Sequence, residues 1–251
     1  MLASLPTRQV ALVLSLLVAG GCSQRPTTAS PCVIQVHDPA ESINRGVFAF
    51  NRTLDDYVLA PVARGYTALP GFMQSGVHNF AANFGEPKVF INDVLQGNGQ
   101  RSLTTLTRFI FNTTLGVAGL VDVSGRMGLE RHDADFGQTF GVWNIADGPI
   151  VELPLLGSHN ARDAVGQVLS FAVDPLGSSD TVEAMGNAAT VGGVVDGRAE
   201  ALPLTDALRE IPDYYQALRD TNAQRRSQFV ADGKVGAVGK STFDCQPGNH
   251  P

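Results

Sequence analysis

The strongest constraint on this chain is a run of 21 residues, 65–85, without a single Asp, Glu, Lys or Arg. A helix that crosses a bilayer needs about 20 apolar residues, so the length invites a transmembrane interpretation. Pro70 and several polar side chains argue against it, because each polar group would need a partner inside the hydrocarbon. The run instead predicts an amphipathic helix, whose apolar face carries Phe72 or Met73, Val77, Phe80 and Phe84 and whose neutral polar face carries Gln74, Ser75, His78, Asn79 and Asn83.

Residues 101–121 repeat this combination of an apolar and a neutral polar face. The helices of soluble proteins normally present charged side chains to water, so neutral polar faces indicate burial against lipid headgroups or around a wet lumen. The alternative is an ordinary helical core in which these faces pack on one another. The two faces of the segment carry Leu103, Leu106, Phe109 and Ile110 on one side and Thr104, Thr105, Asn112 and Thr113 on the other.

Charge is scarce throughout the sequence. Charged residues make up 17% of the chain, whereas they make up about 25% of soluble domains. The formal net charge is −6, and the sequence contains no run of Lys or Arg. Because a protein that binds nucleic acid neutralises phosphates with clustered cations, this balance argues against a nucleic-acid partner.

Residues 1–21 have the character of an export signal. Their apolar run, VALVLSLLV over 10–18, is too short to cross a bilayer as a helix but suits the core of a signal peptide. The run leads into AGGC, ending at Cys22, which resembles the lipobox of bacterial lipoproteins except that Ala19 replaces the usual Leu. The resemblance implies cleavage before Cys22 and stable anchoring by its acyl chains. Ser23 favours the outer membrane; the alternative is an ordinary signal peptide with a free cysteine nearby.

The export signal defines the expected domain organisation. We expect an acylated tether over 22–37, a helical domain over 38–230 and a flexible C-terminal tail over 231–251. Because export leads to an oxidising compartment, we hypothesise a disulfide between Cys32 and Cys245, against the alternative of two unpaired thiols.

Local patterns predict where the helices of the domain begin and end. The sequence DPAE from Asp38 forms a capping box, so a helix should start there, continue to about Leu59 and end at Pro61. Residues 136–156 contain Asp-Gly-Pro and a further proline, and they predict extended segments around a turn. Their alternation would suit a hairpin, but Pro149 favours an irregular loop or an edge strand. Helical periods also occur over 89–95 and 162–173.

The C-terminal part of the domain is expected to contain two further helical regions. The small apolar residues of 184–195 suit close helix packing or insertion in an interface. The last helix should run from Ile211 or Asp213 to Phe229 and direct three arginines outward, namely Arg219, Arg225 and Arg226.

Sequence motifs for catalysis are lacking. The chain contains no G-x-S-x-G, G-x-x-x-x-G-K-[ST], H-E-x-x-H or C-x-x-C motif. Its one acid-rich histidine cluster, around His132, places charged residues next to one another in sequence, where side chains diverge. We therefore predict hydrogen bonding within the fold for His132, and we expect no enzyme, no cofactor and no metal site.

The remaining candidates for chemistry are isolated residues. An enzymatic alternative would need Ser124 or Ser158 as a nucleophile, with His132 or His159 as its base. No chemical role is predicted for the histidines that stand alone in the sequence, which are His37, His78, His159 and His250.

Several long segments with fixed spacing carry a family resemblance. They are DPAESINRGVFAFNRTLDDYVLAPVARGY, NFAANFGEPKVFINDVLQG, RFIFNTTLGVAGLVDV, HDADFGQTFGVWNIADGPIVELPLLG and ARDAVG. In this order they closely resemble the MlaA (VacJ) family of outer-membrane lipoproteins, from about Asp38 to Gly233. The resemblance implies an all-α fold, with a ring-like arrangement of amphipathic helices embedded in the membrane interface and no spanning helix.

The resemblance also implies a function in intermembrane phospholipid transport. Such a protein forms an amphipathic channel beside a trimeric porin, anchored by lipid in the periplasmic leaflet of the bacterial outer membrane. It removes mislocalised phospholipids from the outer leaflet and passes them to the periplasmic carrier MlaC, which serves an inner-membrane ABC transporter complex, and so maintains lipid asymmetry. The alternative is a structural or adaptor lipoprotein that docks a porin without conducting lipid.

Two groups of residues are candidates for the channel. The FAFN segment matches the family's first helix, whose position influences the state of the channel, and this makes Phe48, Phe50 and Asn51 candidates. The neutral polar faces supply the candidates for lumen-facing or lipid-facing side chains, which are Gln74, His78, Asn79, Asn83, Thr105 and Asn112.

Overall fold

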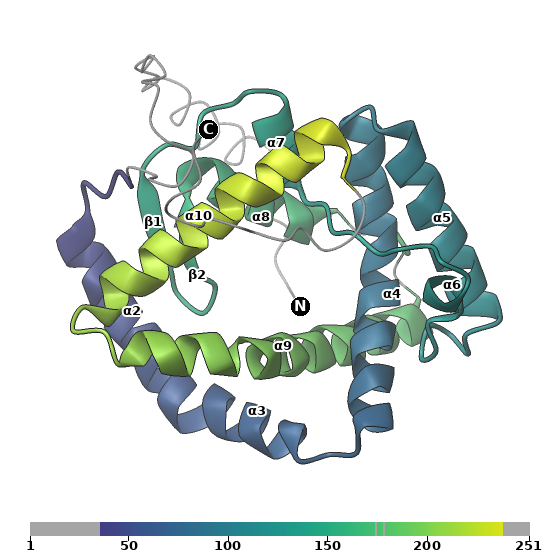
Figure 1. The fold of residues 1–251 in the computed structure, drawn as a ribbon, viewed down its shortest axis with the longest axis horizontal. Coiled ribbons are helices and arrows are strands. Elements are labelled where there is room, and N and C mark those ends of the chain that lie inside the picture. Colours follow the sequence, from purple (N-terminus) through teal and green to yellow (C-terminus); the bar gives the residue numbers. More distant parts are fainter. Residues whose placement is uncertain (1–35, 174, 178, 238–251) are drawn as a thin grey trace, which may run out of the picture. The chain divides into compact units, whose positions relative to one another are not determined.

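Helices account for most of the chain that the computed structural model describes, residues 36–173, 175–177 and 179–237 (Figure 1). These residues belong to one unit, which begins at Ile34. The described elements, in chain order, are α2 (Glu41–Leu54), the π-helical turn η2 (Asp55–Leu59), α3 (Ala60–Thr67), α4 (Gly71–Leu95), α5 (Gly99–Thr114), α6 (Val123–Arg126), α7 (Phe136–Val142), β1 (Ile150–Leu153), β2 (Gly157–Asn160), α8 (Ala161–Ala172), α9 (Asp180–Arg209) and α10 (Tyr214–Val235).

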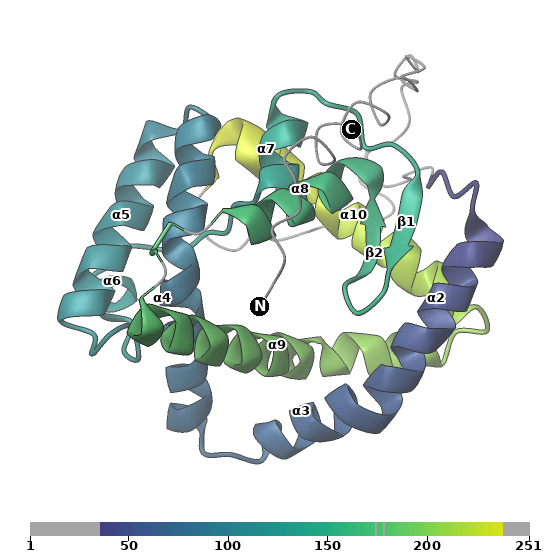
Figure 2. The same ribbon diagram turned by 180° about the vertical axis from the view of Figure 1, so that it is seen from behind.

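The elements of this unit make a closed circuit of contacts. The first helix leads through η2 into α3, α3 packs on α9, and α9 packs on α4. The circuit continues from α4 to α7 and α10, then to β2, and it returns from β1 to α2. Figure 2 shows the same succession from behind. The predicted all-α, ring-like arrangement is confirmed, with one small hairpin added. Within the described ranges, we find no helix with the length and apolar character needed to span a bilayer.

The first helix begins later than the capping box predicts. Its N-cap is Ala40, which makes no side-chain cap. The carboxylate of Asp38 instead accepts hydrogen bonds from Asn44 Nδ2 at 2.7 Å and from Arg219 Nη1 at 3.1 Å. The prediction of a cap is wrong because a cation of α10, distant in sequence, occupies the carboxylate that would supply it.

The predicted helix end at Pro61 is also wrong. The backbone stays helical through η2 into α3, where Pro61 occupies one of the first two positions. A proline in the first turn of a helix lacks only an N–H that would have no intrahelical partner there. The π-helical turn just before it shifts the hydrogen-bond register, so the chain continues as a helix to Thr67.

The charge-free run is divided between two helices. Its first residues end α3, Pro70 is the N-cap of α4, and the remainder forms the first part of α4. This confirms the amphipathic helix, and α4 continues without interruption past Pro87 to Leu95, which includes the helical period predicted over 89–95.

Small residues bring α9 close to α4, as the composition of 184–195 suggests. A Cβ on Gly192 would lie 3.0 Å from Val77, and one on Gly193 would lie 3.3 Å from Ala81. The nearby apolar core lies between α3 and α9 and consists of Ala60, Ala63, Tyr66, Ala199 and Leu202.

Residues 136–156 differ from the extended prediction. The segment opens with α7, because Asp135 caps that helix by accepting a hydrogen bond from the backbone N–H of Gln138 at 2.7 Å. A regular hairpin follows, in which Ile150 pairs with Asn160 and Leu153 with Gly157. The strand begins just after Pro149, so the proline does not have to donate a ladder hydrogen bond.

The last helix begins as predicted and ends later. Asp213 is its N-cap, and the helix runs to Val235, beyond the position at which the tail was expected to begin. Arg225 is exposed, but Arg219 is buried against Asp38 and Arg226 pairs with Asp135. The prediction that all three arginines point outward is therefore wrong, because carboxylates on other elements pair with two of them. Residues 238–251 of the expected tail lie outside the described residues.

Candidate functional site

Helix α5 turns its polar side chains inward and its apolar side chains outward. Leu103, Leu106 and Ile110 are 67%, 39% and 49% exposed. Among the described residues, more polar or charged side chains than apolar ones are fully buried. This inverts the usual amphipathic pattern, in which the apolar stripe faces the core. The inward face of α5 consists of Arg101, Ser102, Thr105, Arg108 and Asn112.

A polar cavity of about 690 Å³ opens onto this inward face. Helices α4 and α5 supply half of its lining residues, and the α6 region, the loop before α7, and α9 supply the others. Its charged lining has an excess of carboxylates over guanidinium groups. The lining residues are His78, Asn79, Ala82, Asn83, Glu86, Arg108, Asn112, Asp122, Gly125, Leu129, Glu130, Arg131, Asp133 and Glu200.

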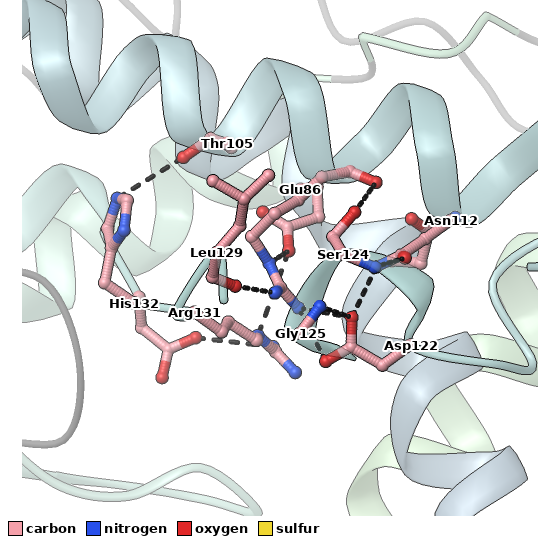
Figure 3. Close-up of polar contacts among 12 residues, drawn as sticks. Glu86, Thr105, Asn112, Asp122, Ser124, Gly125, Leu129, Arg131 and His132 are labelled. Atoms are coloured by element: carbon pink, nitrogen blue, oxygen red, sulfur yellow. Dashed lines mark hydrogen bonds and ion pairs between the residues drawn. The ribbon is translucent and has the colours of Figure 1, made fainter. Parts of the chain in front are cut away.

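Arg108 is the centre of the hydrogen-bond network in this wall. Figure 3 shows its partners Glu86, Asp122 and Leu129 close together. Its Nε donates to Glu86 Oε1 at 3.3 Å, and its Nη2 donates to both carboxylate oxygens of Asp122 at 3.2 and 3.1 Å. Its Nη1 donates to the backbone carbonyl of Leu129. Arg108 is only 3% exposed, so this network satisfies a buried cation and ties α4, α5 and the following loops together.

Asp122 stays ionised in this wall. Burial by itself would raise its pKa, but the Gly125 N–H, the Asn112 amide and the Arg108 guanidinium hold that pKa below its usual value. Asp122 also caps α6 through Gly125 N at 2.9 Å, and Asn112 Nδ2 donates to it at 3.0 Å. It therefore supplies a fixed negative charge at the cavity rim.

Glu86 has the opposite titration behaviour. Its burial raises its pKa to about 7, and the nearby charges of Arg131 and Arg108 offset only part of that effect. Arg131 Nε lies 4.0 Å from Glu86 Oε1, while its Nη2 lies 3.4 Å from Asp133. The wall thus contains a carboxyl group whose charge changes near neutral pH.

A second buried polar group lies next to this wall. The Asp93 carboxylate is 2.9 Å from His132 Nε2 and accepts a hydrogen bond from Thr105 Oγ1 at 2.7 Å. Arg101 Nε lies 3.5 Å from the same carboxylate. These contacts confirm the structural hydrogen bonding predicted for His132.

The polar residues predicted to face the lumen or the lipid lie in different parts of the structure. Asn79 donates to the Leu120 carbonyl at 3.3 Å, and Asn83 donates to Thr113 Oγ1 at 2.9 Å. Both line the large cavity with His78 and Asn112, whereas Gln74 lines a smaller one of about 380 Å³. The structure brings these five together along connected walls.

Thr105 lies apart from these cavities. It is 1% exposed and lines none of the described cavities, because its hydroxyl bonds to Asp93. Its hydroxyl therefore has a structural role in the buried polar group next to the wall.

The three channel candidates on the first helix, Phe48, Phe50 and Asn51, also lie in different environments. Phe48 packs edge-on against Tyr214 and Tyr215, with ring centroids 5.4 and 5.3 Å apart. Phe50 is 56% exposed.

Both the nitrogen and the oxygen of the Asn51 side-chain amide form hydrogen bonds with the hairpin. Its Nδ2 donates to the Leu153 carbonyl at 2.9 Å and to Glu152 Oε1 at 3.1 Å. Its Oδ1 accepts from the Leu155 N–H at 2.8 Å. Asn51 therefore holds the turn between β1 and β2 against α2.

The cysteines of the sequence, Cys22, Cys32 and Cys245, lie outside the described residues. Acylation and the disulfide therefore remain predictions.

The sequence interpretation missed the charged residues of the wall. Glu86 follows the charge-free run directly, and Arg108 lies between two uncharged stretches of α5. A charge on the polar face of a largely neutral amphipathic helix is a signal that could have found both, since such a charge must have a partner when its helix face is buried.

Comparison with known proteins identifies relatives over most of the chain. The sequence model of the MlaA lipoprotein family matches residues 36–229. The intermembrane phospholipid transport system lipoprotein MlaA of Shigella flexneri is 36% identical over 203 residues, which cover 78% of this chain and 79% of that protein. The protein of the same name from Haemophilus influenzae is 29% identical over 232 residues, 89% of this chain and 90% of that protein.

Two further proteins are similar to this chain. A Rickettsia felis protein is 40% identical over 145 residues, and the matched region spans 57% of this chain and 58% of that relative's length. A solved structure from work on the structural basis for maintenance of bacterial outer membrane lipid asymmetry matches with a TM-score of 0.66 and 34% identity, covering 77% of this chain and 98% of that chain. The family match, the relatives and the shared fold together establish that this chain belongs to the MlaA lipoprotein family.

Proposed function

We propose that this chain is an outer-membrane lipoprotein that conducts phospholipids. The observation that carries the proposal is the inverted burial of α5, which exposes Leu103 and Ile110 while Arg108 and Asn112 line a polar cavity. Exposed apolar side chains favour contact with acyl chains, and a polar interior offers partners to a phospholipid headgroup. A lipid path needs both kinds of surface side by side. The names of the MlaA relatives, which describe intermembrane phospholipid transport, support the same function.

The proposed cellular role follows the family resemblance. The protein takes mislocalised phospholipids from the outer leaflet and passes them to the periplasmic carrier MlaC, which serves an inner-membrane ABC transporter complex. A trimeric porin holds the protein in the membrane interface, and acylated Cys22 anchors it in the periplasmic leaflet. Loss of the protein is expected to let phospholipid accumulate in the outer leaflet.

Photo-crosslinking from the cavity wall tests conduction directly. A photoreactive residue at Asn79 lines the cavity, whereas one at Gln216 on α10 is exposed outside it and serves as the control. In native membranes, phospholipid adducts from position 79 in excess of those from position 216 support a lipid path. Crosslinks from position 79 to protein alone would contradict conduction and favour the adaptor function, in which the protein docks a porin without carrying lipid.

A further inference from the structure

Three potential metal ligands meet between α4 and α9. His78 Nδ1 lies 2.7 Å from Asp196 Oδ2 and 3.7 Å from Glu200 Oε1. One ligand atom from each residue lies within 4.8 Å of the other two. Asp196 and Glu200 are four residues apart on α9, so they share one helix face, and α4 presents the imidazole to that face.

A neighbouring hydroxyl orients the central carboxylate. Tyr66 donates a hydrogen bond from its hydroxyl to Asp196 Oδ1 at 2.8 Å, which leaves Oδ2 directed toward His78. Metal-binding carboxylates commonly have such a hydrogen-bonded partner, which holds the ligand in position.

The surroundings favour access by a cation. The side chains of His78 and Glu200 are 43% and 62% exposed, and both residues line the cavities of about 690 and 380 Å³. The larger cavity carries five carboxylate residues, Glu86, Asp122, Glu130, Asp133 and Glu200, against the two guanidinium groups of Arg108 and Arg131. An excess of carboxylates in a concave site raises the local concentration of cations, and the open side leaves room for water ligands.

We infer that His78, Asp196 and Glu200 form a binding site for a divalent transition-metal ion, with Zn²⁺ the best match. One imidazole nitrogen and two carboxylate oxygens are ordinary zinc ligands, and a fourth position would remain for water. Mg²⁺ and Ca²⁺ prefer oxygen ligands only, so the imidazole selects against them. The bound ion would link α4 to α9 at the edge of the large cavity. The site is independent of whether lipid passes through that cavity.

Zinc titration of the purified full chain tests the site. The protein is kept in detergent, stripped with a chelator and titrated with ZnCl₂ by calorimetry, with MgCl₂ as the comparison. We expect zinc binding that His78→Ala and Glu200→Gln each weaken by more than about tenfold, since each removes a ligand. His159→Ala is the matched control, because His159 lies in the hairpin and lines a different cavity.

Circular dichroism establishes that the variants are folded, and the melting temperature supplies a second measurement. Zinc should raise the melting temperature of the wild type and of His159→Ala but not that of His78→Ala, because a ligand stabilises the state that binds it. Equal zinc affinity in wild type and His78→Ala, or no zinc binding by the wild type, would overturn the site. Crosslinking from position 79 with chelator present tests lipid conduction separately, so either proposal can fail without the other.

Discussion

Individual side chains in this protein make contacts that are unusual for their type. Glu86, Arg101 and Arg108 are at most 3% exposed, although such residues are almost never fully buried without partners. Their partners come from other segments, as Glu86 and Asp122 do for Arg108. Pairing limits the cost of burying each charge, although burial still raises the pKa of Glu86 to about 7.

Replacing Glu86 with Gln should change how stability depends on pH. A carboxyl group whose pKa is raised on folding stabilises the protein below its unfolded pKa and loses this contribution as pH rises through the folded value. The free energy of unfolding of the wild type should therefore fall relative to Glu86→Gln between the ordinary value of 4.5 and about 7. At 1.36 kcal/mol per pKa unit, the relative change is up to about 3 kcal/mol.

Denaturant unfolding at a series of pH values measures this difference. Glu130→Gln is the control, because Glu130 is exposed in the lining of the same cavity, and its difference from wild type should stay constant. Parallel curves for wild type and Glu86→Gln would show that the protonation of Glu86 is not linked to folding.

At the scale of elements, close backbone approaches position the helices around the polar interior. Gly166 of α8 faces Gly137 of α7 so closely that a Cβ on it would lie 2.4 Å from the Gly137 backbone nitrogen. On α9, a Cβ on Gly192 would instead meet the side chain of Val77 of α4, at 3.0 Å. Backbone atoms cannot rotate away as a flexible side chain can, so the contact between Gly166 and Gly137 determines the spacing of α7 and α8.

Gly166→Ala should push α7 and α8 apart. Overpacking of this kind costs about 1–3 kcal/mol, which thermal or denaturant unfolding would detect. Gly197→Ala in α9 is the matched control, because no atom lies within 4 Å of the added Cβ. That change should be neutral or stabilising by up to about 1 kcal/mol, since Ala favours a helix. Equal effects from the two substitutions would exclude a steric role for Gly166.

The outward face of α5 should contribute to membrane binding. Replacing Leu103, Leu106 and Ile110 together by Gln should weaken flotation with phospholipid vesicles, because these exposed side chains would lose their burial in acyl chains. The experiment uses the Cys22→Ser background, so that an acyl anchor does not mask the effect. Gln100→Asn, an exposed polar exchange on the same helix, should leave flotation unchanged. Unchanged flotation of the triple variant would mean that this face does not enter the bilayer.

At the scale of the whole described unit, polar contacts join segments far apart in sequence. Asp38, before the first helix, bonds to Asn44 of α2 and to Tyr215 and Arg219 of α10. These contacts connect the two ends of the helical circuit. The apolar core between α3 and α9 is small by comparison, so buried polar bonds carry much of the specificity of assembly.

Asp38→Asn should therefore destabilise the unit as a whole. The Asp38 side chain is 3% exposed and that of Arg219 is 9% exposed, and breaking a buried ion pair costs about 3–5 kcal/mol. Asp220→Asn is the matched control, because Asp220 pairs with the same arginine but is 45% exposed. It should cost at most about 1 kcal/mol. Thermal denaturation in detergent compares the two, and equal losses would contradict the role of Asp38 in closing the circuit.

The sequence by itself determined the helical character of the chain, the two neutral amphipathic faces and the family resemblance. These properties are local or lie in contiguous segments, and a period of 3.6 residues specifies which side chains share a helix face. It also predicted the small-residue packing of α9, which close contacts with α4 confirm.

Only the tertiary structure decided which environment each face meets. Periodicity predicts the two faces of α5 but does not specify which of them faces inward. The packing of neighbouring helices places Leu103 outside. Likewise, His78 stands alone in sequence but meets Asp196 118 positions later. The prediction of a capping box at Asp38 was wrong for the same reason, because Arg219 binds the carboxylate that would have capped the helix. Contacts between distant segments depend on how the helices assemble, and a local sequence pattern does not specify that assembly.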